Sequence, residues 1–120
     1  MQKDNIIQVK SFDFALSIIK LYKVLCKQSE FIISKQLLRS GTGIGANIEE
    51  ALAAESKKDF IHKMSISLKE ARETKYWLRL LNESELVELT PDSQIQDINE
   101  IINILTSIIK TSQNKSIQNS

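Results

Sequence analysis

A few residues of the chain have the chemical types that catalysis requires, and their positions limit what they could do. The sequence holds one histidine, His62, and one thiol, Cys26, on different predicted helices and in no recognisable pairing motif. A Cys–His nucleophile pair stays open as an alternative. A lone cysteine on an apolar helix face is, however, typical of a core residue. These residues therefore predict no catalytic site.

Two carboxylates, Glu70 and Glu73, are three residues apart, which places them on one face of a helix. Such a pair could bind a metal ion or act as acid and base. Di-metal helical bundles use Glu-x-x-His pairs, and the sequence contains none. We expect a polar contact at an interface instead. The sequence predicts no metal site, no cofactor and no small-molecule substrate, and we do not expect an enzyme.

Basic side chains gather on the same predicted helix. Residues 57–81 hold seven basic and three acidic residues, whereas residues 82–109 hold six acidic and no basic ones. One face carries a basic stripe with a single aromatic residue, made of Lys58, Lys69, Arg72, Tyr76 and Arg79. Such a stripe could hold phosphates and stack a base of RNA. The alternatives are a solvated face, or attraction to the acidic segment on a neighbouring helix or subunit.

This helix has two further faces at heptad spacing. The first is a core seam of Phe60, Met64, Ser67, Ala71, Thr74, Leu78 and Leu81. The second, opposite to it, consists of His62, Ile66, Glu70, Glu73, Trp77 and Leu80. We favour a subunit interface for this second face, with the two glutamates meeting basic groups of a neighbour. The alternative is that Trp77 covers the end of the core or packs under a loop.

The elements that position these residues are predicted to be four helices. They should span residues 11–28, 31–55, 57–81 and 91–111, with Ser11, Ser56 and Thr90 as N-caps and residues 82–90 as a connection. We expect residues 1–10 to be an N-terminal extension and residues 112–120 a polar, flexible tail. The predicted fold is one all-α domain, an antiparallel up-and-down four-helix bundle.

All three glycines, Gly41, Gly43 and Gly45, lie within the second predicted helix. Because glycine in a helix interior costs about 1 kcal/mol relative to alanine, the cluster needs a structural reason. Close approach of another backbone or a local break would supply one. A phosphate-binding loop is the functional alternative, but its Gly-Lys-Ser/Thr ending is missing.

The composition points to a cytoplasmic protein that associates with itself. One cysteine excludes an internal disulfide framework and fits a reducing compartment. We find no signal peptide and no apolar run long enough to cross a membrane. The apolar residues of the fourth predicted helix cover about half of its surface, more than a lone bundle requires.

Three segments resemble a known family. Residues 39–51 (RSGTGIGANIEEA), 56–60 (SKKDF) and 69–81 (KEARETKYWLRLL) are similar to the signature of four-helix-bundle proteins related to the 23S rRNA intervening-sequence proteins. The likeness spans essentially the whole chain. Carried over by position, the characteristic polar and aromatic residues would be Arg39, Asn47, Glu50, Glu70, Glu73, Tyr76 and Trp77. The chain departs from the common motif at Gly43, where a serine is usual.

The resemblance implies a small up-and-down bundle that assembles as a homopentamer, with no known catalytic residues. Some members of the family are encoded inside insertions in 23S rRNA genes, and a distant basic branch binds nucleic acid as an accessory protein of diversity-generating retroelements. Since this chain has a net charge of only +1, the resemblance supports fold and assembly better than RNA binding. We therefore expect a non-enzymatic, homo-oligomeric scaffold, with RNA binding by the basic stripe as the alternative.

Overall fold

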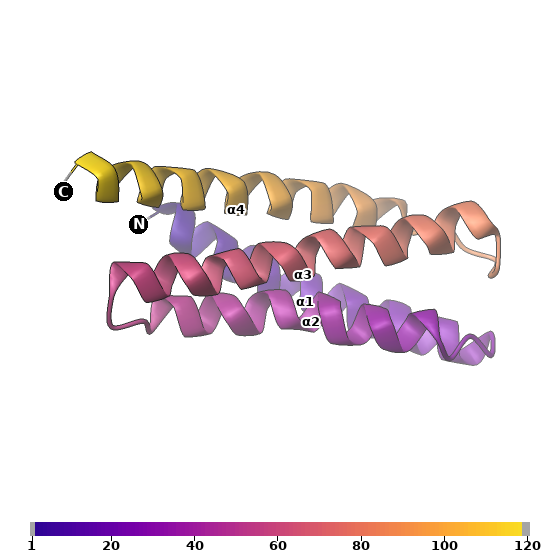
Figure 1. The fold of residues 1–120 in the computed structure, drawn as a ribbon. Helices are drawn as coiled ribbons and strands as arrows, with labels where there is room; N and C mark the ends of the chain where they lie inside the picture. Colours follow the sequence, from indigo (N-terminus) through magenta and orange to yellow (C-terminus); the bar gives the residue numbers. More distant parts are fainter. Residues whose placement is uncertain (1, 119–120) are drawn as a thin grey trace.

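The fold was analysed on a computed structural model, which describes the backbone of residues 2–118 and the side chains of residues 6–115. Within that range the chain forms four helices and no strand: α1 (Gln2–Lys27), α2 (Ile33–Leu52), α3 (Lys57–Ser84) and α4 (Asp92–Gln118). The predicted all-α fold with four helices is confirmed. The chain turns back at each connection, so both ends of the described chain lie at the same end of the bundle (Figure 1).

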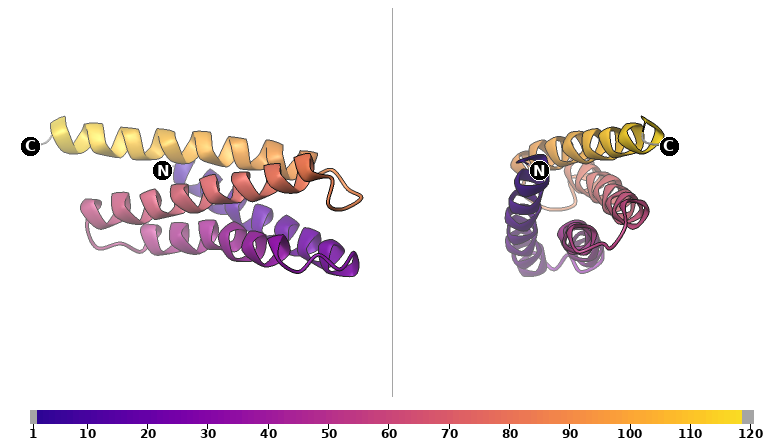
Figure 2. Two further views of the ribbon diagram at one scale, coloured as in Figure 1. Left: turned by 45° about the vertical axis from the view of Figure 1, so that its right-hand side comes forward. Right: turned by 90° about the vertical axis from the view of Figure 1, so that its left-hand side faces the viewer.

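The helices follow one another around the bundle in chain order, and α4 lies obliquely across α1 and α3, as the end-on view of Figure 2 shows. Each helix contacts the next, and α1 also contacts α4. Among the described residues no Cα atoms of the diagonal pairs, α1 with α3 or α2 with α4, lie within 8 Å of each other. The α1–α2 side of the bundle therefore lies opposite its α3–α4 side.

The core seam predicted for α3 is confirmed. Six of its seven residues are buried, namely Met64, Ser67, Ala71, Thr74, Leu78 and Leu81. The small polar ones bind the neighbouring helix α2. The hydroxyl of Ser67 donates to the carbonyl oxygen of Ile44 at 2.9 Å, and the hydroxyls of Thr74 and Ser40 are hydrogen-bonded at 2.8 Å. These bonds satisfy buried polar groups and hold the α2 and α3 backbones close together.

The N-cap predicted for α3 is also present. The Ser56 hydroxyl accepts a hydrogen bond from the Asp59 backbone N–H at 3.0 Å, and Asp59 adds a negative charge to the first turn. Pro91 directly precedes α4, and its carbonyl oxygen accepts the first bond from Ile95 at 2.9 Å. Both starts follow from local sequence chemistry.

Most helix boundaries lie within three residues of the expected ones, but the start of α1 and the end of α4 differ by more. Helix α1 begins at Gln2, and Ser11 lies inside it, buried, with its hydroxyl donating to the carbonyl oxygen of Gln8 at 3.1 Å. The apolar periodicity continues before Ser11, because Ile7 is fully buried in the core. Residues 2–10 are therefore helical. Helix α4 likewise continues to Gln118, because polar residues without glycine or proline do not end a helix. Residues 119–120 of the expected tail lie outside the described residues.

The start of α2 is held by a residue that the sequence did not single out. Glu30 is only 8% exposed, and its carboxylate accepts backbone N–H bonds from Ile32, Ile33 and Ser34 at 3.1, 3.1 and 2.7 Å. Ser29, just before it, has a positive φ of 62° and ends the turn after α1. Glu30 thus does the work of an N-cap from a position where the chain turns between two helices.

The glycine cluster does not break α2, which is continuous across it. Gly41 is buried against Ile18 of α1, and a Cβ at this position would lie 3.0 Å from two Ile18 side-chain carbons. A Cβ at Gly45 would lie 3.6 Å from the backbone oxygen of Ser11, in ordinary contact. The structure therefore favours close helix approach over a local break.

Candidate functional site

A polar cluster joins α2 to α3 on the surface of the bundle. Arg39 of α2 donates to the carboxylates of Glu70, at 3.5 Å, and of Glu73, both on α3. It also donates to the side-chain oxygen of Gln36 at 2.9 Å. The indole N–H of Trp77 donates to the same Glu73 oxygen at 2.9 Å. The basic group that the glutamates were expected to meet on a neighbouring subunit is thus supplied by their own chain.

The cluster sets the charge state of Glu73. The hydrogen bond from Trp77 holds the pKa of the Glu73 carboxyl below its ordinary value, and Arg39 lowers it further against an opposing effect of partial burial. A general acid at neutral pH needs the opposite shift, a raised pKa. The ionised, cation-bound carboxylate is therefore suited to joining two helices and not to proton transfer.

Replacing Trp77 with phenylalanine should raise the pKa of Glu73 towards its ordinary value, because the largest cause of the shift is removed. The stabilisation from a lowered carboxyl pKa is present above the unfolded-state value and is lost as pH falls through the folded-state value. Trp77→Phe should therefore lose less stability than wild type between neutral and acid pH. NMR titration of the Glu73 carboxyl carbon measures the shift. Tyr76→Phe is the matched control, and an equal pKa in Trp77→Phe and wild type would refute the assignment.

Two other residues of the family motif, Asn47 and Glu50, lie outside this cluster. The Asn47 amide donates to the carbonyl oxygen of Gly43 at 2.8 Å within α2, and Glu50 pairs with Lys63 of α3 at 3.0 Å. A Cβ at Gly43 would lie 3.3 Å from an oxygen of Glu70. Gly43 thus faces the polar cluster, and the missing side chain leaves the Glu70 carboxylate free to reach Arg39.

The two candidate nucleophile residues do not meet. Cys26 lies near the C-terminal end of α1 and His62 near the N-terminal end of α3, which are opposite ends of the bundle on helices that share no contact (Figure 1). In the part of the chain that the structure describes, no three His, Cys, Asp or Glu side chains form a group that could hold a metal ion. The same part contains no helix of the length and apolarity needed to cross a bilayer.

The basic stripe is exposed along α3, as expected. Arg79 pairs with Glu83 one turn further on, at 3.2 Å. No described carboxylate lies within ion-pair distance of Lys58, Lys69 or Arg72. Of the described acidic segment only Glu83 therefore pairs with the stripe, although α4 is the neighbour of α3. The remaining described ion pair of the segment joins Glu100 to Lys10 of α1.

Tyr76 lies near the C-terminal end of the stripe, between Arg72 and Arg79. Its ring meets that of Trp77 edge to face, with centroids 5.2 Å apart, and it is 57% exposed. Together with three cations and one apolar residue of α4 it lines a shallow hollow of about 220 Å³, formed by Arg72, Lys75, Tyr76, Arg79 and Ile102. This end of the stripe thus combines positive charge with an accessible aromatic ring that projects beside a shallow hollow.

The apolar face predicted for a subunit interface is largely covered by the chain itself. Trp77 is half-buried against the core, Ile66 is half-buried, and only Leu80 is exposed, at 37%. The wide apolar surface of α4 is covered too: none of its described large apolar side chains is exposed. Because α4 packs against both α3 and α1, its wide apolar face is used within a single chain.

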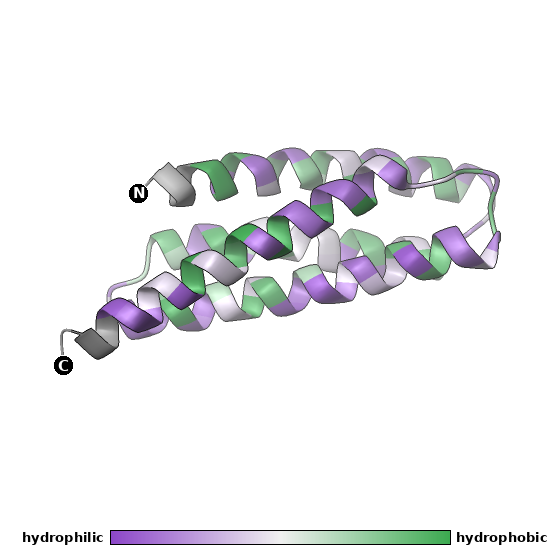
Figure 3. Ribbon diagram, turned by 90° about the horizontal axis from the view of Figure 1, so that it is seen from above, coloured by the Kyte–Doolittle hydropathy of each residue, from purple (hydrophilic) through white to green (hydrophobic). Residues whose placement is uncertain are grey.

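The unpartnered apolar surface lies instead on α1, which the sequence did not single out. Five large side chains follow its outer face at 36–63% exposure: Ile6, Val9, Phe12, Leu16 and Ile19. Figure 3 shows hydrophobic residues recurring along the length of this helix. We name these five residues the α1 stripe. An apolar row of this length on a monomer's surface marks an interaction site.

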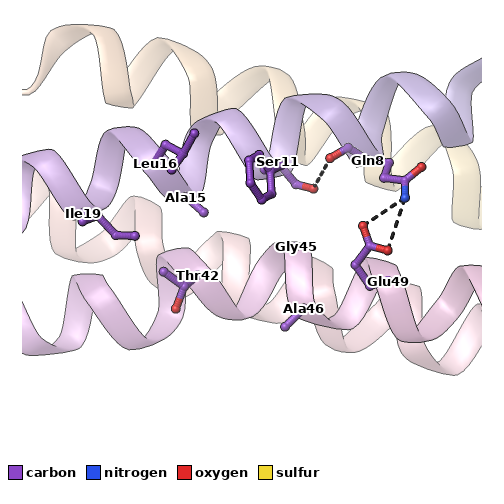
Figure 4. Close-up of a pocket in the computed structure, with 10 residues that line it drawn as sticks. Gln8, Ser11, Ala15, Leu16, Ile19, Thr42, Gly45, Ala46 and Glu49 are labelled. Carbon is purple, nitrogen blue, oxygen red and sulfur yellow. Dashed lines mark hydrogen bonds between the residues drawn. The ribbon is translucent and has the colours of Figure 1, made fainter.

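Beside the α1 stripe runs a groove between α1 and α2, about 300 Å³ in volume (Figure 4). Phe12, Leu16 and Ile19 form the α1 wall, and Thr42, Gly45 and Ala46 form the α2 wall. These small α2 residues give the groove its depth. At one end Gln8 donates two hydrogen bonds to the Glu49 carboxylate, at 3.0 and 3.2 Å. The groove is thus apolar with an acidic end.

Comparison with known proteins agrees with this architecture. The family model of the 23S rRNA-intervening sequence protein matches residues 3–110. The chain belongs to this family. Among solved structures, it is similar to the crystal structure of a protein with unknown function from the S23 ribosomal protein family of Bacteroides thetaiotaomicron VPI-5482. The two share 53% identity and a TM-score of 0.85, over 90% of this chain and 98% of that one. No curated protein matches the sequence.

Proposed function

We propose that the protein is a non-enzymatic scaffold of the cytoplasm, an antiparallel up-and-down bundle that associates with copies of itself as a homopentamer. The α1 stripe is the observation that carries the proposal. Its five exposed apolar side chains gain free energy when a protein surface covers them, at roughly 25 cal/mol per Å². The pentameric state rests on the resemblance to the intervening-sequence proteins. The absence of a catalytic role is supported by the neutralised pair Glu70 and Glu73.

Light scattering on the purified protein tests self-association. We expect a mass several times the 13.7 kDa of one chain at micromolar concentration, and five times that mass for the pentamer. A mass of one chain at that concentration would refute self-association, and a different multiple would refute only the pentamer.

RNA binding is the second candidate, supported by the unneutralised stripe around Tyr76. Lys58, Lys69 and Arg72 are exposed cations without a described carboxylate partner, and the ring of Tyr76, one turn from Arg72, could stack on a base. The affinity should then fall steeply as salt concentration rises, because phosphate contacts release counterions.

Binding of a structured RNA at low salt tests this candidate. The double variant Lys69→Ala/Arg72→Ala should weaken binding at least tenfold and lessen the salt dependence. Lys20→Ala/Lys23→Ala removes the same charge from exposed positions of α1 and serves as the control. Equal binding by the two double variants would count against the stripe as the RNA site.

A further inference from the structure

Two surfaces on opposite sides of the bundle lack a counterpart within the described chain. One is the groove between α1 and α2, and the other is an α3 ridge formed by Tyr76 and Leu80. Since the helices follow each other around the bundle in chain order, the α1–α2 side and the α3–α4 side face away from each other (Figure 2). One chain cannot bring the two surfaces together, but two chains can.

The two surfaces are complementary in shape. The groove is concave and apolar, because Gly45 and Ala46 present almost no side chain on its α2 wall (Figure 4). The α3 ridge projects two large side chains, with Tyr76 57% and Leu80 37% exposed. Large side chains that fill a pocket lined by small ones are the usual centre of a protein interface.

The two surfaces are also complementary in charge. The only charged residue that lines the groove is Glu49, and no described cation lies within ion-pair distance of it. The charges beside the α3 ridge are mostly positive, with Arg72 and Lys75 free of described carboxylate partners. Groove against groove would place two Glu49 carboxylates and two concave surfaces together, which both charge and shape oppose.

We propose that the α1–α2 groove of one copy receives the α3 ridge of a second copy. The inference rests on the proposed self-association and names the surfaces that produce it. Different patches of the two copies meet, so the contact is head-to-tail, and such contacts close into a ring when the rotation between copies permits. In the assembly Tyr76 and Arg79 are covered, which leaves Lys58 and Lys69 as the accessible part of the basic stripe.

Complementation between two single variants tests the pairing. Leu16→Asp damages the groove, Tyr76→Asp damages the α3 ridge, and Leu86→Asp places the same change on an exposed apolar residue of the connection between α3 and α4. We expect each of the first two variants alone to have the mass of one chain, 13.7 kDa, and Leu86→Asp to keep the wild-type mass. An equimolar mixture of the first two should form a dimer, because one intact groove and one intact ridge remain.

The outcomes separate this inference from the proposed function. A monomeric wild type refutes both. An oligomeric wild type with oligomeric Leu16→Asp and Tyr76→Asp refutes only the pairing of surfaces. Monomeric variants that do not form a dimer when mixed refute the head-to-tail arrangement. Ala46→Arg is the second groove variant: Ala46 is exposed, so its replacement fills the groove without disturbing the core, and circular dichroism verifies the fold.

Discussion

Replacing Glu30 with alanine should lower the free energy of unfolding by about 2 kcal/mol. Its carboxylate accepts bonds from three backbone N–H groups at the start of α2, and no side chain of Ile32, the residue before that helix, can replace it. Removal leaves the three donors without this acceptor in a buried setting. It also removes a negative charge from the helix N-terminus, where the helix dipole favours one.

Urea unfolding followed by circular dichroism measures this effect. Glu30→Gln keeps an acceptor oxygen but not the charge, so we expect it to lose about half as much stability. Glu55→Ala, at an exposed position after α2, is the control and should change the stability by less than about 0.5 kcal/mol. If Glu30→Ala were as stable as Glu55→Ala, the capping role would be wrong.

The second large effect is a contrast between two glycines four residues apart on α2. Gly41→Ala should leave the protein about 2 kcal/mol less stable than Gly45→Ala. At Gly41 the new methyl group would lie 3.0 Å from two carbons of Ile18, whose side chain is fully buried and cannot move aside. At Gly45 the closest atom is the Ser11 hydroxyl at 3.4 Å, so the substitution gains helix propensity without a clash.

The contrast is informative because both substitutions are chemically identical. Each removes the same backbone freedom from the unfolded chain, so at a concentration below that of self-association the difference reports contact with α1. Thermal and urea unfolding at one protein concentration measure it, since self-association makes stability depend on concentration. Equal stability of the two variants would show that Ile18 of α1 moves aside and makes room for a methyl group at position 41.

The fold could be predicted largely from periodicity and local capping. The seam from Met64 to Leu81 follows a heptad spacing that only one helix face can satisfy, and Ser56 is followed by an acidic residue at the capping distance. The predicted start of α1 was wrong because it relied on Ser11 as an N-cap. Serine is a common N-cap, but its residue type does not distinguish a cap from a buried hydroxyl that bonds to the backbone of its own helix.

The sequence predicted which residues of α3 share the candidate site, but not which residue they bind. The spacing of Glu70, Glu73 and Trp77 placed them on one face, as observed, but the source of their cation depended on how α2 packs beside α3. The sequence predicted the interface on α3 and α4, because periodicity shows how wide the apolar face of a helix is. It does not show which part of that face a neighbouring helix covers. In the bundle α4 has two neighbours that cover its wide face, and the outer face of α1 remains open.

Consecutive helices are neighbours in the bundle, and this arrangement also determines how the protein should fold. Three of the four helix pairs in contact are joined by short connections, so most of the core forms with little loss of loop-closure entropy. A topology of such low contact order folds fast. The exception is the seam between α1 and α4, which joins the two ends of the chain, has the least extensive packing of the four and is bridged by Lys10 and Glu100. That seam should close last during folding and open first in native-state hydrogen exchange, exposing the inner face of the helix that carries the α1 stripe.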